Sequence, residues 1–139
     1  MSADMSDQSA ITEQGPAGQL ILVVDDEFDV LSAYTILFES LGFRVRTAGN
    51  GREALAVAAG EAPAIVVSDF MMPVMDGADF CRAWRSDPLL RGIPFILTTA
   101  GLLRKDADIP YDTLFKKPVR FEMLVDEITR LIAAAARSG

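Results

Sequence analysis

The sequence contains no histidine, and this absence excludes several classes of catalytic and metal site. Ser-His and Cys-His nucleophile pairs and histidine-ligated zinc sites all need the missing imidazole. A single cysteine, Cys81, excludes an internal disulfide and suits a reducing compartment. Basic residues are also scarce, with 13 Lys and Arg against 20 Asp and Glu and a formal charge of −7. We therefore expect no nucleic-acid binding through bulk electrostatic attraction.

Long hydrophobic runs are also missing, so no membrane-spanning helix is expected. The first basic residue is Arg44, and the N-terminus therefore lacks the basic region of a secretory signal peptide. We expect a cytoplasmic protein. Residues 1–18 are rich in Ser, Gly and acidic side chains and are predicted to form a disordered tail. Residues 19–137 are predicted to form one domain, large enough to bury a core.

From residue 19 onward, short apolar runs alternate with segments of helical periodicity. The predicted strands cover 19–24, 43–47, 64–69, 94–99 and 112–116, and the predicted helices cover 30–41, 52–59, 78–86 and 121–132. This alternation is typical of an α/β fold with a parallel sheet and helices on both of its faces. The segment from 101 to 110, between the last two strands, leaves room for only a short or irregular fourth helix.

Acidic side chains follow two of the most apolar predicted strands. Asp25 and Asp26 come directly after the first strand, and Asp69 ends the third. Parallel sheets bind ligands beyond the carboxyl ends of their strands, so these carboxylates are expected to converge. Three close carboxylates repel one another unless a cation lies among them, and Mg²⁺ prefers such oxygen ligands. The alternative is that each acid only caps the helix that follows it.

Two further strand ends supply a hydroxyl and an ammonium group. The fourth strand ends at Thr98-Thr99, and the fifth ends at Lys116-Lys117. A nucleophilic carboxylate, Mg²⁺, a hydroxyl and a lysine are the groups that phosphoryl transfer requires.

In this order and spacing, the motifs resemble the receiver domain of two-component response regulators, of the single-domain, chemotaxis-regulator-like kind. The matching segments are Val24-Asp25-Asp26-Glu27, Asp69-Phe-Met-Met-Pro73, Met75-Asp76-Gly77, Pro94 to Ala100 and Lys117-Pro118. The resemblance covers about residues 19–137. It implies a flavodoxin-like, doubly wound, five-stranded sheet in the order 2-1-3-4-5. It also implies a signalling domain rather than an enzyme that turns over small molecules.

The resemblance implies that Asp69 accepts a phosphoryl group from a phosphohistidine. The donor would be a sensor histidine kinase or a histidine phosphotransfer protein. Mg²⁺ would be held by Asp26, by the Asp69 carboxylate and by the backbone carbonyl of Met71, while Asp25 would act through a metal-bound water. Output is expected through protein contact or onward phosphotransfer, since no effector domain follows.

Two further residues receive roles from the same resemblance. Thr99 corresponds to the switch hydroxyl that moves toward the phosphoryl group. Lys117 corresponds to the lysine that pairs with the phosphate, and its bond to Pro118 is cis in the family. The sequence departs from the family where an aromatic residue usually stands three positions before the lysine, because Leu114 occupies that position.

Two other functions use the same residues. A dehalogenase-like phosphatase would need a second acid two residues after Asp69, where Met71 stands instead. A pseudo-receiver would bind partners without phosphorylation, which the complete set of acids, threonine and lysine disfavours. Two arginines of the third predicted helix, Arg82 and Arg85, are expected on solvated faces.

Overall fold

The structure, a computed structural model, describes residues 18–101, 103 and 108–138. Its elements in chain order are β1 (Leu20–Val24), α2 (Phe28–Ser40), β2 (Arg44–Ala48), α3 (Gly51–Gly60), β3 (Ile65–Asp69), α4 (Gly77–Ser86), β4 (Phe95–Thr99), β5 (Thr113–Lys116) and α5 (Phe121–Ser138). Strands and helices alternate as the sequence predicts, and their bounds differ from the predicted ones mainly at the ends. The predicted tail, apart from Gly18, lies outside the described residues.

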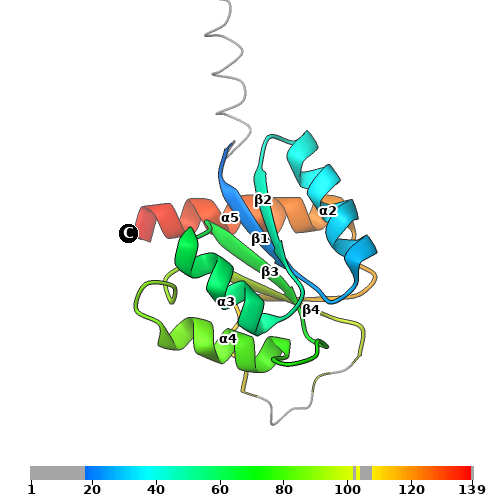
Figure 1. Ribbon diagram of the computed structural model, residues 1–139. Coiled ribbons are helices and arrows are strands. Elements are labelled where there is room, and N and C mark those ends of the chain that lie inside the picture. Colours follow the sequence, from blue (N-terminus) through cyan, green and yellow to red (C-terminus); the bar gives the residue numbers. More distant parts are fainter. Residues whose placement is uncertain (1–17, 102, 104–107, 139) are drawn as a thin grey trace, which may run out of the picture.

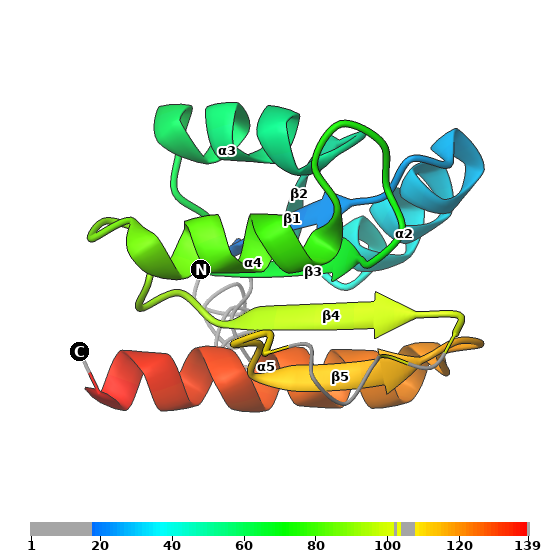
Figure 2. The same ribbon diagram turned by 90° about the horizontal axis from the view of Figure 1, so that it is seen from below.

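The strands form one five-stranded sheet in the order β2-β1-β3-β4-β5, and every neighbouring pair is parallel. The predicted doubly wound fold and its strand order are therefore confirmed. The register pairs Asp69 with Thr98 and Thr99 with Lys116. This pairing brings the chemically active ends of β3, β4 and β5 to one edge of the sheet, as the common direction of their arrows shows (Figure 2).

Two layers of helices cover the sheet, with α3 and α4 on one face and α2 and α5 on the other (Figure 1). Successive strand residues point to opposite faces, so Leu22 and Val24 pack against α3 and α4, while Ile21 and Val23 pack against α2 and α5. All four side chains are buried. Burial on both faces explains why these strands are continuously apolar in the sequence.

Local side-chain chemistry fixes where several helices begin and end. Asn50 and Asp76 accept hydrogen bonds from the third backbone N–H of α3 and of α4, at 2.9 Å each. Gly42 ends α2 with a φ of 96°, a left-handed conformation that favours glycine. The thiol of Cys81 is buried in the core beneath α4, as its helical position predicts.

Between β4 and β5, the described residues contain no helix. The centre of this segment, residues 102 and 104–107, lies outside the described residues, so the prediction of a short or irregular fourth helix stays untested there. Ile109 is buried in the core, and the half-buried Leu114 packs against the same cluster. Among the residues that the structure describes, no helix combines the length and hydropathy needed to cross a membrane.

Candidate functional site

Three carboxylates converge at the carboxyl end of the sheet, as the strand ends predict. Asp25 follows β1, Asp26 is the next residue, and Asp69 ends β3. One oxygen from each carboxylate lies within 4.8 Å of the others. Asp25 and Asp69 are buried, whereas Asp26 is exposed. The cluster therefore has an inner pair of acids and one acid that faces solvent.

The backbone holds the inner acid Asp25 in place from two sides. Its N–H donates to the carbonyl of Ala48 at the end of β2 (3.1 Å). Its Oδ1 accepts a hydrogen bond from the backbone N–H of Glu27 (2.9 Å). The second oxygen, Oδ2, faces the ammonium group of Lys117 at 3.6 Å.

Lys117 brings a positive charge into the acid cluster from the residue that follows β5. Its Nζ lies 3.2 Å from Oδ1 of Asp69, closer than it is to Asp25. Its backbone N–H donates to the carbonyl of Thr99 at 2.8 Å, so the last residue of β4 stays paired with the residue after β5. The bond from Lys117 to Pro118 is cis, as the family resemblance implies.

Burial and the neighbouring groups shift the pKa values of the Asp25 carboxyl and the Lys117 ammonium. Burial raises the pKa of Asp25, the hydrogen bond from Glu27 opposes that rise, and the charge of Asp69 adds to it. Burial acts to lower the pKa of Lys117, yet its hydrogen bond to Asp69 and the charges of both inner acids leave that pKa raised. Three carboxylates gather around the Lys117 ammonium, and such an excess of negative charge attracts a further cation.

Thr99 ends β4 beside the cluster and is buried. Its hydroxyl pairs with the backbone of Gly101, where it donates to the carbonyl and accepts from the N–H, each at 3.2 Å. The preceding Thr98 accepts a hydrogen bond from the Phe70 N–H through its carbonyl (2.9 Å), which ties β4 to the residue after Asp69. In this conformation the Thr99 hydroxyl is therefore hydrogen-bonded to the loop that follows β4.

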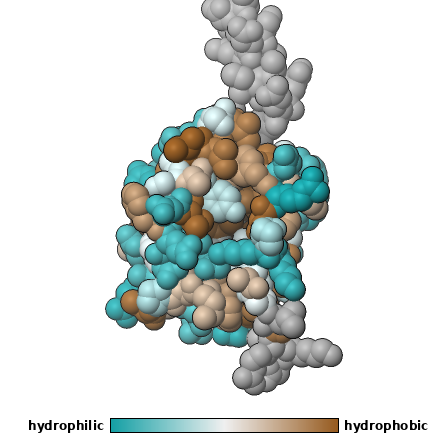
Figure 3. Space-filling view, turned by 90° about the vertical axis from the view of Figure 1, so that its right-hand side faces the viewer, coloured by the Kyte–Doolittle hydropathy of each residue, from teal (hydrophilic) through white to brown (hydrophobic). Residues whose placement is uncertain are grey.

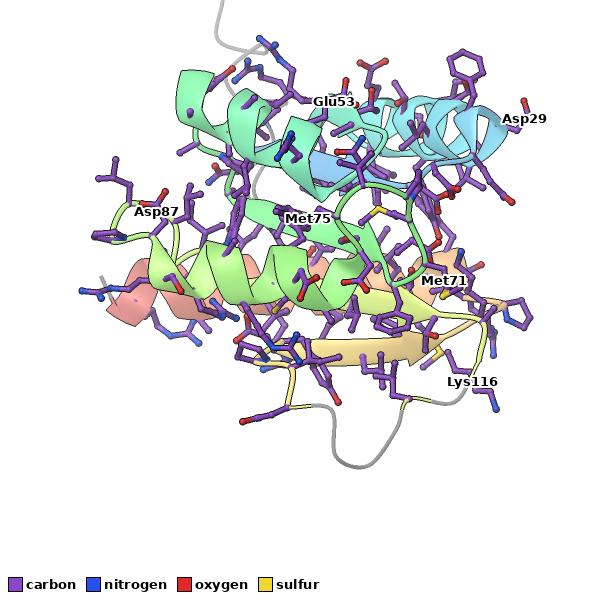
Figure 4. The ribbon with its side chains drawn as sticks, turned by 60° about the horizontal axis from the view of Figure 1, so that its bottom comes forward. Asp29, Glu53, Met71, Met75, Asp87 and Lys116 are labelled. Atoms are coloured by element: carbon purple, nitrogen blue, oxygen red, sulfur yellow. The ribbon has the colours of Figure 1, made fainter. Side chains whose placement is uncertain are left out.

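The loop between β3 and α4 forms the rim of the site next to Asp69. Met71 is exposed there, at the same end of the molecule as Lys116 (Figure 4). A tight turn follows, in which the N–H of Met75 donates to the carbonyl of Pro73 at 2.7 Å. Val74, at the centre of this turn, has a φ of 69°, which is rare for a β-branched residue.

Comparison with known proteins identifies the family. The family model of the response regulator receiver domain matches residues 21–129, which is most of the chain. This chain belongs to the response regulator receiver domain family. Its curated relatives include response regulator PleD of Caulobacter vibrioides, which is 34% identical over 136 residues. That match covers 86% of this chain and 30% of PleD, so the chain spans about a third of the length of the relative.

Solved receiver domains have the same fold. Chemotaxis response regulator CheY4 of Vibrio cholerae is 28% identical with a TM-score of 0.75, and the match covers 83% of this chain and 99% of CheY4. The receiver domain of sensor histidine kinase PA1611 from Pseudomonas aeruginosa is also 28% identical, with a TM-score of 0.76 and coverage of 84% and 99%. That structure has a magnesium ion coordinated in its active site cleft.

The acidic site of this receiver domain is thus of the kind that coordinates magnesium in a relative. The family is one of signalling domains rather than metabolic enzymes, and it acts in two-component systems with histidine kinases. The structure brings Asp25, Asp26, Asp69 and Lys117 together, as predicted. Thr99 lies on the adjacent strand end, with its hydroxyl turned to Gly101.

One side of the receiver domain next to the site exposes several apolar side chains. Along α2, the side chains of Phe28, Ile36, Leu37 and Leu41 are exposed. A shallow groove of about 300 Å³ runs between α2 and β2, lined by Phe28, Leu31, Ser32, Thr35, Ile36 and Thr47. In Figure 3, hydrophobic residues gather over the upper part of this face, above a band of hydrophilic ones. Because α2 starts directly after the acids, this surface continues to the rim of the site.

One arginine of α4 does not lie in solvent as the sequence predicts. The expected solvated position of Arg85 is wrong, since only 22% of its side chain is exposed and its guanidinium bonds to several other segments. Its neighbour Arg82 is exposed, as expected. The partners of Arg85 lie up to 27 residues away, so no local pattern in the sequence marks them.

Proposed function

We propose that this receiver domain is the phosphoacceptor of a two-component system or phosphorelay, with Asp69 as the residue that is phosphorylated. The observation that supports this most strongly is the position of the Asp69 carboxylate. It lies among two further acids and 3.2 Å from the Lys117 ammonium, at the carboxyl end of a parallel sheet. This arrangement combines a nucleophile with charges that stabilise a transferring phosphoryl group.

In the proposed reaction, an oxygen of Asp69 attacks the phosphorus of a phosphohistidine. A P–O bond to the carboxylate forms as the P–N bond breaks, and the electron pair of the P–N bond returns to the imidazole. Lys117 then pairs with a phosphoryl oxygen instead of with the free carboxylate. Thr99 exchanges its contact with Gly101 for a hydrogen bond to the phosphoryl group, which alters the loop that follows β4.

The donor set fits Mg²⁺. Asp26 is the exposed member of the cluster and is proposed as a direct ligand, together with the Asp69 carboxylate and the Met71 carbonyl, while Asp25 acts through water. Oxygen ligands of this type, with one or two carboxylates, are what Mg²⁺ prefers. When bound, Mg²⁺ supplies positive charge that neutralises the phosphoryl oxygens.

The proposed phosphodonor is a sensor histidine kinase or a histidine phosphotransfer protein. The exposed apolar side chains of α2 support this, because they offer contact area for a protein beside the acids. We further propose that residues 19–137 are the receiver domain, that residues 1–18 are a disordered tail, and that the protein works in the cytoplasm. Output would then pass through protein contact or onward phosphotransfer.

Acetyl phosphate and Mg²⁺ provide the direct test. Incubation should add the mass of one phosphoryl group to the intact protein, and Asp69→Asn should abolish the addition. Asp29→Asn is the matched control, because Asp29 is an acid near the start of α2 outside the cluster, and this variant should be labelled like the wild type. Equal labelling of Asp69→Asn would refute the assignment.

Lys117→Ala separates the phosphoacceptor from the two alternatives. The variant should fold normally and show impaired phosphorylation, because the ammonium beside Asp69 is lost. A pseudo-receiver would take up no phosphoryl group in any variant. Repeated turnover of small phosphate esters by the wild type would instead favour the dehalogenase-like reaction, which the exposed Met71 two residues after Asp69 disfavours.

A further inference from the structure

The guanidinium group of Arg85 joins three segments at the end of the sheet opposite the acids. Its Nε donates to the carbonyl of Pro110 (2.9 Å), and its Nη1 donates to the carbonyls of Arg91 (2.8 Å) and Ile93 (3.2 Å). Its Nη2 pairs with Oδ2 of Asp112 at 2.6 Å. One side chain of α4 thus holds both the residues that lead into β4 and those that lead into β5.

Asp112 connects Arg85 to the backbone of β4. Its N–H donates to the carbonyl of Phe95 (2.8 Å), and its Oδ2 accepts from the N–H of Phe95 (2.7 Å). The carboxylate therefore satisfies the first backbone N–H of β4 while Arg85 balances its charge. Together, Arg85 and Asp112 fix how the start of β5 is paired with the start of β4.

The β5 strand depends on such an anchor more than the central strands β1, β3 and β4 do. It is four residues long, lies at an edge of the sheet and, among the strands that the structure describes, pairs only with β4. Its side chains are half-buried or exposed, whereas β1, β3 and β4 are buried throughout. Among the described residues between β4 and β5, no helix covers β5 on the α4 face.

The far end of β5 leads directly to the catalytic lysine of the proposed function. Figure 4 shows the two ends, with Asp87 (two residues after Arg85) on one side and Met71 and Lys116 on the other. Lys117 is held by the hydrogen bond from its backbone N–H to the carbonyl of Thr99 and by the ion pairs with the two inner acids. Without the Arg85 anchor, β5 keeps its pairing with β4, the hydrogen bond of Thr113 to Glu127 of α5 and the packing of its side chains. We expect these contacts to hold Lys117 in register less firmly.

We propose that Arg85 is a positioning residue for phosphoryl transfer: with Asp112, it anchors β5 against β4 and so holds Lys117 beside Asp69 and Asp25. The inference rests on the proposed role of Lys117. A guanidinium suits this task because its rigid set of donors reaches carbonyls and a carboxylate from several directions at once.

The test compares Arg85→Ala with Arg82→Ala. Arg82 lies one turn earlier on α4 and contacts the carbonyl of Asp108 and the side chain of Asp79, but neither of the paired strand starts. Amide hydrogen exchange reports the anchor directly. In Arg85→Ala, the Asp112 and Lys117 amides should lose protection, while those of β1 and β3 should keep it. Arg82→Ala should leave all of these amides as protected as in the wild type.

Mg²⁺ affinity supplies a second readout that simple destabilisation would not raise. Lys117 competes with Mg²⁺ for the inner acids, so releasing the lysine should increase affinity by about fivefold, the effect of one unit charge near 4 Å in water. Lys117→Ala should produce the same rise. The double variant Arg85→Ala/Lys117→Ala should then bind Mg²⁺ no more tightly than Lys117→Ala alone.

Two further variants keep the proposal falsifiable. Arg85→Lys retains the charge but not the set of donors and should show an intermediate loss of protection. If Arg85→Ala fails to fold, Asp112→Asn removes the charge pair and keeps an acceptor for the Phe95 N–H, and it should give the same changes in smaller size. The proposal is wrong if Lys117 protection and Mg²⁺ affinity match those of Arg82→Ala. Neither readout needs phosphorylation, so a failure of Asp69 to accept phosphate would refute the proposed function separately.

Discussion

Replacing Gly77 with alanine should perturb the phosphoacceptor site from the side of α4. Gly77 is the first residue of α4, and its N–H donates to the carbonyl of Phe70 at 2.8 Å. An added Cβ would lie 2.5 Å from the backbone oxygen of Asp69, 2.8 Å from Phe70 Cα and 2.8 Å from Leu97 Cδ1. Two of these atoms are backbone, so a side-chain rotation cannot relieve the overlap.

The expected cost follows from the overpacking of a closely packed interior. Inserting a methyl group into such a site typically destabilises a protein by about 1–3 kcal/mol. Alanine has a better helix propensity than glycine, but at the first position of α4 this gain is only partial. We therefore expect the free energy of unfolding to fall by about 2 kcal/mol, which corresponds to a Tm lower by roughly 6–8 °C for a domain of this size.

Urea unfolding followed by circular dichroism measures this change, and Gly60→Ala is the matched control. Gly60 is the last residue of α3, and beyond its chain neighbours and the adjoining helix backbone no atom lies within 4 Å of an added Cβ, so this variant should be neutral or more stable. Phosphorylation of Gly77→Ala by acetyl phosphate should also slow, because the backbone of Asp69 must shift. The reasoning fails if Gly77→Ala unfolds within about 0.5 kcal/mol of the wild type, which is the usual range of surface substitutions.

Three further predictions concern Asp26, Val74 and the buried thiol of Cys81. Asp26→Asn should raise stability without metal by about 1 kcal/mol or less, since one charge leaves the acid cluster, and should weaken Mg²⁺ binding measured by calorimetry. Unchanged affinity would show that Asp26 is not a ligand. Val74→Gly should raise the unfolding free energy by about 1 kcal/mol, because φ is 69° and the exposed side chain contributes little packing. A less stable variant would contradict this account of strain. Burial raises the pKa of the Cys81 thiol to about 12, above its ordinary value of 9.0, so the folded state retains a proton that the unfolded state loses. The free energy of unfolding should therefore fall as pH rises from 9 toward 12. Alkylation of the Cys81 thiol at pH 8 should be slow until urea unfolds the chain. Rapid labelling of the native protein would refute the burial argument.

Much of the fold was predictable because strands and helices leave local periodic signals. The apolar runs that end at Val24 and Asp69 predict strands buried on both faces, and the structure confirms both. Gly42 predicts the end of the first helix because of its conformational freedom, and its φ of 96° confirms it. The strand order 2-1-3-4-5 came from the family resemblance, since periodicity does not determine which strands are neighbours.

The sequence by itself determined which chemical groups stand at which strand ends: acids after β1 and at the end of β3, Thr99 at the end of β4 and Lys117 after β5. Parallel pairing then obliges these groups to share one edge of the sheet. Only the tertiary structure decided how they interact: that Asp25 is buried while Asp26 is exposed, that Lys117 lies nearer to Asp69, and that the Thr99 hydroxyl faces Gly101. It also decided that Arg85, expected in solvent, joins the starts of β4 and β5. The physical reason is that burial and ion pairing depend on groups distant in the chain, whose distances are set by packing and not by any local pattern.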